Sequence, residues 1–195
     1  MPDHQRKLDF VTDSLRPDLG GNLRHGDPAT FSPLVWEYVV ERLAIGSVLD
    51  VGSGEGHAAR WFHRRGLVSY ACEAQEDNVR RAVHPTVRLD LTESALTCPV
   101  DLVHCVEVVE HVDAQHLDHL LQTLANGRFV LMTHAGPGQP GHHHVNCQTG
   151  VYWVQQLAGY GYELLEAHTA CIRKIASQEV IPTFFGQSGL LFARR

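Results

Sequence analysis

The stretch Val48-Leu-Asp-Val-Gly-Ser-Gly-Glu-Gly56 decides the fold class of this sequence. The apolar run at 47–51 predicts a buried strand, and three alternating glycines end it before a helical segment at 57–65. Glycines in such a turn let the backbone approach a ligand closely, because they carry no side chain. The spacing is GxGxG rather than the GxGxxG of dinucleotide-binding turns, and the acidic Asp50 precedes it. Neither feature favours a pyrophosphate ligand.

Strand and helix patterns alternate along the rest of the chain. Parallel strands that are buried on both faces are short apolar runs, and the helices between them complete β-α-β units. We therefore expect an α/β fold with a mainly parallel sheet, whose ligands bind beyond the carboxyl ends of the strands. The expected strands are 47–51, 68–74, 87–91, 102–106, 129–133, 162–175 and 189–193, and the expected helices are 33–45, 57–65, 76–83, 114–124 and 149–159.

Two further acidic residues stand at the ends of the next two expected strands. Glu73 ends the strand at 68–74, where a carboxylate accepts hydrogen bonds from ribose hydroxyls. Asp90 stands near the end of the strand at 87–91, where a carboxylate can accept from an adenine amino group while the amide of Leu91 donates to a ring nitrogen. Together with Asp50 and the glycines, these residues predict a pocket for a nucleoside that carries positive rather than negative charge.

Four motifs in this order resemble those of the class I S-adenosylmethionine-dependent methyltransferases. They are VLDVGSGEG at 48–56, CEA at 72–74, RLDL at 88–91 and DLVHCVEVVEHV at 101–112. The resemblance covers roughly residues 34–195 and implies a Rossmann-like sheet of seven strands, mainly parallel with the last strand antiparallel and with helices on both faces. It also implies an enzyme that binds S-adenosylmethionine and aligns a nucleophile in line with the methyl group.

The resemblance further implies a set of residues that contact the cofactor. These are Asp50, Gly52, Gly54, Gly56, Glu73, Asp90, Leu91 and Val106.

The fourth strand is followed by Glu107-Val-Val-Glu110-His111. In a helical turn these three polar side chains share one face, and two carboxylates with an imidazole can hold Mg²⁺ or Mn²⁺. The pattern resembles that of the ubiquinone-pathway O-methyltransferases and of the small-RNA 2′-O-methyltransferases, which complete the metal site with a later histidine. The alternative is that no metal binds and the carboxylates cap the following helix.

A later histidine is available in the loop after the fifth strand. His134 is expected at the strand end as a general base, beside Glu107 and His111 as the other candidate catalytic residues. Neighbouring side chains in an extended loop point in different directions, so we expect His143 or His144 as a fourth metal ligand. The loop and the helix after it also resemble small microbial and phage-type methyltransferases of unassigned substrate.

Composition limits the classes of protein to which the chain can belong. Of the 195 residues, 44% are apolar and 19% are charged, which predicts one globular domain at 31–195 with an arm or lid at 1–30. The net charge of −6 disfavours a broad nucleic-acid-binding face. The sequence has no membrane-length apolar stretch and no secretory signal, and its five cysteines form no CxxC pair. We therefore expect a cytoplasmic protein and no membrane partner.

The predicted function is O-methylation of a small molecule or a saccharide with S-adenosylmethionine, with Mg²⁺ or Mn²⁺ as a second cofactor if the metal interpretation holds. One alternative is a metal-assisted 2′-O-methyltransferase of RNA ends, which the acidic charge disfavours. The other alternative is a non-catalytic protein that only binds the cofactor. The sequence makes no prediction of the oligomeric state.

Overall fold

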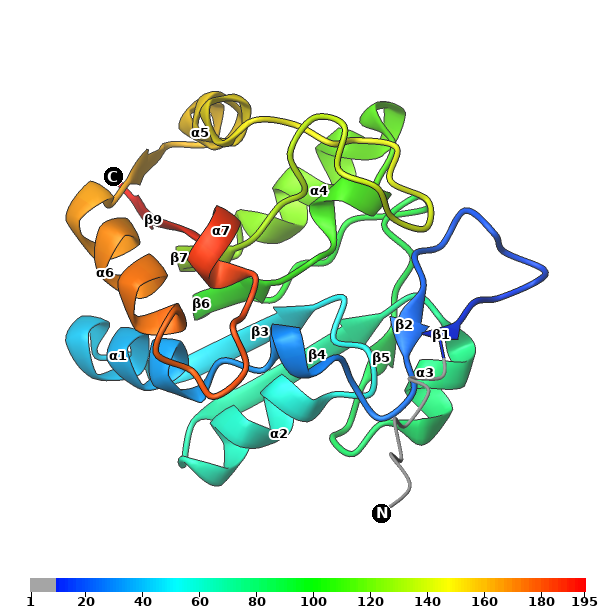
Figure 1. The fold of residues 1–195 in the computed structure, drawn as a ribbon, viewed down its shortest axis with the longest axis horizontal. Coiled ribbons are helices and arrows are strands. Elements are labelled where there is room, and N and C mark those ends of the chain that lie inside the picture. The colour runs from blue at the N-terminus through cyan, green and yellow to red at the C-terminus, as the bar shows by residue number, and fades with distance from the viewer. Residues whose placement is uncertain (1–9) are drawn as a thin grey trace, which may run out of the picture.

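A seven-stranded sheet forms the centre of the protein, which is seen in a computed structural model that describes residues 10–195 (Figure 1). Its strand order is β5-β4-β3-β6-β7-β9-β8, and only β9 runs antiparallel to its neighbours. The predicted sheet of seven strands with the last strand antiparallel is therefore confirmed. The strands are β3 (Ser47–Val51), β4 (Val68–Glu73), β5 (Val87–Arg88), β6 (Val100–Cys105), β7 (Gly127–Met132), β8 (Tyr162–Leu164) and β9 (Leu190–Arg194).

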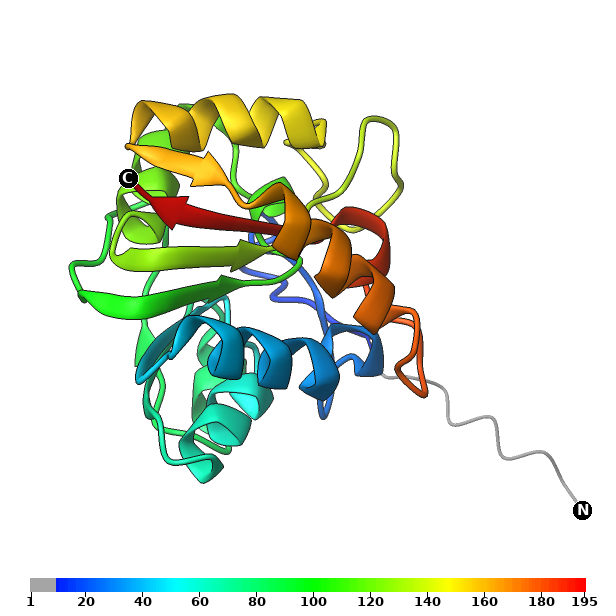
Figure 2. The ribbon, with the colours of Figure 1, turned by 90° about the vertical axis from the view of Figure 1, so that its left-hand side faces the viewer.

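Helices cover both faces of this sheet. Helices α1, α2 and α6 pack on one face through side chains such as Trp36, Phe62 and Ile172, and α1 lies beside α6 in Figure 2. Helices α4 and α5 pack on the other face through Leu121 and Trp153. The helices are α1 (Pro33–Leu43), α2 (His57–Arg64), α3 (Glu76–Arg81), α4 (Leu117–Leu124), α5 (Gly150–Gly159), α6 (Glu166–Ala176) and α7 (Phe185–Ser188), with 3-10 turns η1 (Pro28–Thr30), η2 (Val109–His111) and η3 (Ala114–His116).

Strands β3 and β6 lie at the centre of the sheet, and both of their faces are covered by helices, so their side chains are apolar on both faces. Val48 and Leu102 point into the core beneath α1 and α6, whereas Leu49 and Val103 point into the core beneath α4 and α5. Burial on both faces stabilises each such side chain by about 1.5–3 kcal/mol. The sheet is therefore a rigid frame that holds the turns at its carboxyl edge.

The expectation of a strand over 162–175 is wrong for most of its length. Only Tyr162–Leu164 forms β8, and the chain then enters helix α6. In α6 the buried residues Thr169, Ile172 and Ala176 recur every three or four positions, which is the spacing of one helix face. The third strand, expected over 87–91, is also shorter and comprises only β5.

The arm expected at 1–30 has structure of its own in its described part. Strand β1 (Phe10–Val11) pairs antiparallel with β2 (Asn22–Leu23), and this ribbon lies beside α3 in Figure 1. The first nine residues of the expected arm lie outside the described residues. Within residues 10–195, no helix has the length and apolar character needed to cross a membrane.

Candidate active site

A cavity of about 780 Å³ opens where the parallel strands end. The turn after β3, the ends of β4 and β6, the arm and the histidine loop all contribute to its lining. This position matches the general rule that open α/β sheets bind ligands beyond the carboxyl ends of their strands. Its size lies within the range of cavities that hold cofactors together with small substrates.

The glycine turn has a backbone that only glycine adopts readily. Gly52, Gly54 and Gly56 have φ angles of +65°, +55° and +76°. A side chain at Gly52 would also place its Cβ 2.3 Å from a methyl carbon of Val108. Gly52 and Gly54 line the cavity, whereas Gly56, expected to contact the cofactor, is outside the lining and packs against His84 as the residue before α2.

The carboxylate of Glu73 holds this turn in place from the end of β4. It accepts hydrogen bonds from the backbone N–H of Gly54 at 2.7 Å and of Gln75 at 2.9 Å. Burial raises the pKa of Glu73, and these amide hydrogen bonds oppose that rise. The same carboxylate lines the cavity, where it can face hydroxyl donors of a ligand.

Asp50 belongs to a buried chain of polar groups that sequence reasoning missed. The indole N–H of Trp36 donates to Nε2 of His104 at 3.0 Å, so the ring proton of His104 is on Nδ1, which lies 2.7 Å from Oδ1 of Asp50. The other oxygen of Asp50 accepts from the amide of Ala59 at 3.2 Å. The only available signal was a histidine within the apolar strand β6, at the position that pairs with Asp50.

Asp90 is held by its own turn and by the arm. Its Oδ1 accepts from the amide and hydroxyl of Thr92, and its Oδ2 accepts from the guanidinium of Arg16 at 2.6 Å. Burial alone would raise the pKa of Asp90, but these hydrogen bonds lower it overall. Leu91 and Val106 line the cavity with Asp90.

The described part of the arm crosses the cavity and touches both of its ends. The side-chain amide of Gln75, beside Glu73, donates to the carbonyl oxygen of Gly20. The backbone of Gly20 also packs against the ring of His111, and Phe10 makes an edge contact with His142 at 5.6 Å between ring centres. The arm therefore connects the glycine turn to the histidine loop.

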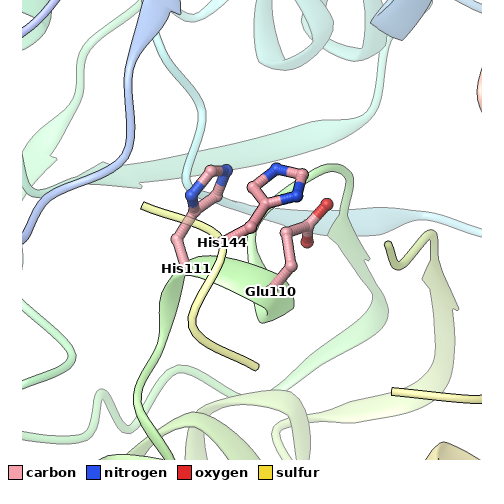
Figure 3. A group of neighbouring side chains, drawn as sticks. All are labelled: Glu110, His111 and His144. Carbon is pink, nitrogen blue, oxygen red and sulfur yellow. The ribbon is translucent and has the colours of Figure 1, made fainter. Parts of the chain in front are cut away.

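The segment after β6 brings together three of the predicted metal ligands. Glu110 and His111 from η2 and His144 from the loop have ligand atoms that all lie within 4.8 Å of one another (Figure 3). Glu107 is not in this group. Its φ of +54° turns the chain, and its carboxylate instead accepts from the hydroxyl of Thr133 at 2.9 Å.

Backbone carbonyls fix the protonation of both rings in the group. Nδ1 of His111 lies 3.2 Å from the carbonyl oxygen of His143, and Nδ1 of His144 lies 3.1 Å from that of Gln139. A carbonyl oxygen only accepts, so each Nδ1 carries a proton and Nε2 is the ring atom of each histidine that can face a ligand. Of the two histidines expected as a further ligand, His144 supplies a side chain to the group, whereas His143 supplies only its backbone to His111.

The carboxyl group of Glu110 is buried, and its pKa is raised. Both oxygens of Glu110 are shielded from solvent and have no hydrogen-bond partner among the described residues. Burial, followed by the neighbouring charge of Glu107, raises the pKa of Glu110 to about 8. Burial and the nearby ring of His144 lower the pKa of His111 to about 4. A buried carboxyl group without a hydrogen-bond partner, beside two imidazole rings whose Nδ1 atoms are held by carbonyl oxygens, fits a bound cation, which would supply the missing partner.

His134, expected as a general base beside the methyl group, does not line the cavity. The chain turns after β7, and the amide of His134 donates to the hydroxyl of Ser188. Its ring lies between the carbonyl of Ala135 and the start of α5 at Gly150. Burial lowers the pKa of His134. The structure therefore places His134 outside the cavity lining, because the chain turns after β7 in a direction that the spacing along the strand did not show.

Comparisons with known proteins agree with this geometry. A family model described as a methyltransferase domain matches residues 23–168. The chain therefore belongs to the class I S-adenosylmethionine-dependent methyltransferases, and the predicted class of enzyme is confirmed. No curated protein sequence matches the chain.

Solved structures share the fold at low sequence identity. Magnesium protoporphyrin IX methyltransferase from Synechocystis, solved with bound S-adenosylhomocysteine, is 17% identical with a TM-score of 0.63, over 96% of this chain and 90% of that one. A methyltransferase from Archaeoglobus fulgidus is 16% identical with a TM-score of 0.59, over 83% and 91%. The methyltransferase domain of bacterial CtHen1 is 15% identical with a TM-score of 0.55, over 80% and 93%.

The glycine turn generates a prediction with a matched control. Gly52→Ala should weaken S-adenosylhomocysteine binding at least about tenfold, because the new Cβ displaces Val108 and the turn. Gly66→Ala has the same kind of positive φ but no atom within 4 Å, so it should cost about 1–2 kcal/mol of stability and leave binding unchanged. Calorimetric titration and thermal unfolding of both variants check this. Equal binding by the two variants would contradict the role of the turn.

Proposed function

We propose that this methyltransferase transfers its methyl group to a hydroxyl oxygen of a small molecule or saccharide. The observation that carries the proposal is the group of Glu110, His111 and His144 beside the cofactor cavity. Carboxylate and imidazole are groups that activate a hydroxyl, either as proton acceptors or as ligands of a divalent cation.

The cofactor would lie across the ends of β3, β4 and β5. Gly52 and Gly54 leave open backbone for its amino-acid part, Glu73 would accept from the ribose hydroxyls, and Asp90 with Leu91 would face the adenine. The lining of this end is acidic and apolar, which suits a ligand with a sulfonium charge and no phosphate.

In the reaction, the acceptor oxygen forms a bond to the methyl carbon while the bond from that carbon to sulfur breaks. The electron pair of the broken bond stays on sulfur, and the hydroxyl proton leaves to a protein group or to water. The enzyme's part is to align the oxygen, exclude competing water and receive that proton. Where no metal is bound, the free lone pair of neutral His111 can take the proton, and Glu107, held by Thr133, lines the cavity beside it.

Mg²⁺ or Mn²⁺ fits the same group of side chains. Glu110, His111 and His144 would hold the ion, and the protonated Nδ1 atoms of both rings are oriented by carbonyl groups, as is usual for metal-binding histidines. A bound ion would lower the pKa of a coordinated acceptor hydroxyl.

A 2′-O-methyltransferase of RNA ends is the second candidate. The Glu-x-x-Glu-His segment with a later histidine favours it. A protein that only binds the cofactor is the third, and the buried polar group after β6 argues against it, because such a group is costly to keep without a role.

Two adjacent histidines make a direct test of the metal and of the chemistry. His144→Ala should abolish high-affinity Mn²⁺ binding measured by electron paramagnetic resonance and lower O-methyl transfer, whereas His143→Ala should leave both unchanged, since only its backbone contacts the group. With labelled S-adenosylmethionine and hydroxylated acceptors, the label should appear as a methyl ether, and chelation should remove activity that Mg²⁺ or Mn²⁺ restores.

Three results would contradict this account. Activity that survives chelation would show that the reaction needs no metal. Equal Mn²⁺ binding by the two variants would show that His144 is not a metal ligand. Label found only on nitrogen or carbon would show that the acceptor atom is not oxygen.

We further propose that the arm acts as a lid over the bound cofactor. Arg16 joins the arm to Asp90 at 2.6 Å, so Arg16→Ala should speed the release of S-adenosylhomocysteine about fivefold, which corresponds to the loss of ~1 kcal/mol. Arg24→Ala, at an exposed position of the same arm, is the control and should not change the rate. Stopped-flow displacement measures both, and equal release rates would show that the arm does not gate the cofactor.

A further inference from the structure

One wall of the cavity is built from two segments that are distant in sequence, residues 27–34 and 179–184. The amide of Phe184 donates to the carbonyl of Ala29 at 3.1 Å, and the amide of Leu34 donates to Glu179 at 2.8 Å. The hydroxyls of Ser32 and Thr183, both buried, bond at 2.5 Å. These bonds fix the wall as one unit, which we call the apolar wall.

The apolar wall presents hydrophobic side chains that the protein itself leaves uncovered. Phe31, Val180 and Ile181 line the cavity and are 40%, 101% and 49% exposed. Pro28, Pro33 and Phe184 also line the cavity at this wall. Exposed apolar side chains that gather at a cavity mark a surface that a ligand covers, because removing them from water is favourable.

The apolar wall adjoins the chemical groups of the site. Phe31 makes an edge contact with Trp36, whose indole N–H bonds to His104 and through it to Asp50 beneath the glycine turn. Asp27, which caps η1 in the wall, is near enough to Glu107 for its charge to add to the effect of burial and raise the pKa of that carboxyl. A molecule on the wall therefore reaches both the cofactor and the segment after β6.

The charge of the cavity limits what that molecule can carry. Eight acidic residues line it, among them Asp27, Glu107 and Glu179, and within residues 10–195 no lysine or arginine does. The nearest guanidinium groups lie outside the lining, where Arg16 pairs with Asp90 and Arg81 with Glu55. Phosphate or carboxylate on an acceptor would meet these carboxylates with no lysine or arginine of the described lining to pair with, which disfavours binding.

We propose that the methyl acceptor is an uncharged or cationic molecule with an apolar, ring-sized body that packs on Phe31, Val180 and Ile181 and carries the methylated hydroxyl. This inference rests on the proposed function and narrows it. It excludes RNA ends and other anionic acceptors. The transfer itself is unchanged: the acceptor oxygen gains the methyl group, the electron pair stays on sulfur, and the hydroxyl proton leaves.

A neutral probe and an anionic probe with the same ring and hydroxyls test the proposal. Methyl 3,4-dihydroxybenzoate is neutral and 3,4-dihydroxybenzoate is anionic, and both carry the same ring and neighbouring hydroxyls. Calorimetry on the full chain, loaded with S-adenosylhomocysteine and Mg²⁺, should show the ester binding at least about tenfold more tightly than the acid. Dopamine, as the cationic probe, should also exceed the acid. Tighter binding of the acid or of a short oligoribonucleotide, or no binding of the ester at millimolar concentration, would overturn the proposal.

A variant with an added positive charge makes the test specific to the wall. Val180→Lys adds a cation at a fully exposed position of the wall, so the acid should gain affinity relative to the ester by about fivefold or more. Val151→Lys adds the same charge on α5, at an exposed position outside the lining, and should leave the ratio unchanged. The same ratio in both variants would show that the acceptor does not bind at this wall.

Failure of the inference and failure of the proposed function give different results. Methyl ethers formed preferentially on the anionic probe would overturn the acceptor class and leave O-methylation standing. Ester binding with the expected selectivity, but with no methyl ether formed, would support the acceptor class and overturn O-methylation.

Discussion

The carboxylate of Glu73 is the constraint on which the cofactor site depends. It bonds the backbone of Gly54 and of Gln75, and so fastens the turn after β3 to the end of β4. With positive φ angles in the turn and Val108 against Gly52, this bond leaves the backbone little freedom. The same carboxylate faces the cavity, so the group that shapes the turn is also available to a ligand.

A second buried chain supports the turn from below. Trp36 of α1 holds His104, which holds Asp50, and the three belong to different elements of the fold. Both partners of Asp50 are donors, so each of its two oxygens has a hydrogen bond within the core. The polar chain therefore replaces apolar packing at one place in the sheet, directly beneath the cofactor cavity.

Most of the fold, and the place of the glycine turn and the strand-end acids at one edge of the sheet, could be predicted from the sequence because they depend on local patterns. Glycine spacing and strand-end acids fall within short segments, and the order of strands and helices follows from periodicity. The partners of those residues could not be predicted, because they come from distant elements. Arg16 reaches Asp90 from the arm, and His104 meets Asp50 only through strand register. His134 and His144 both lie in the segment between β7 and α5. The path of that segment places His144 in the cavity lining and His134 outside it, and residue spacing does not encode that path.

The cavity joins an acidic cofactor end to an apolar wall, and a buried carboxyl group with two imidazoles lies beside them. These three surfaces suit three different partners: a sulfonium-bearing nucleoside, an apolar acceptor and a cation. Binding of the nucleoside is the central claim, since an acceptor has no role here unless the methyl donor binds as described.

Isothermal titration of the wild-type chain and of Glu73→Ala with S-adenosylhomocysteine and with NAD tests that central claim most directly. The account predicts that wild type binds S-adenosylhomocysteine far more tightly than NAD. It also predicts that Glu73→Ala loses about 1.5–3 kcal/mol of that affinity, roughly ten- to 150-fold, while Glu93→Ala, an exposed acid, loses none. Binding of NAD as tight as that of S-adenosylhomocysteine, or unchanged affinity in Glu73→Ala, would contradict it.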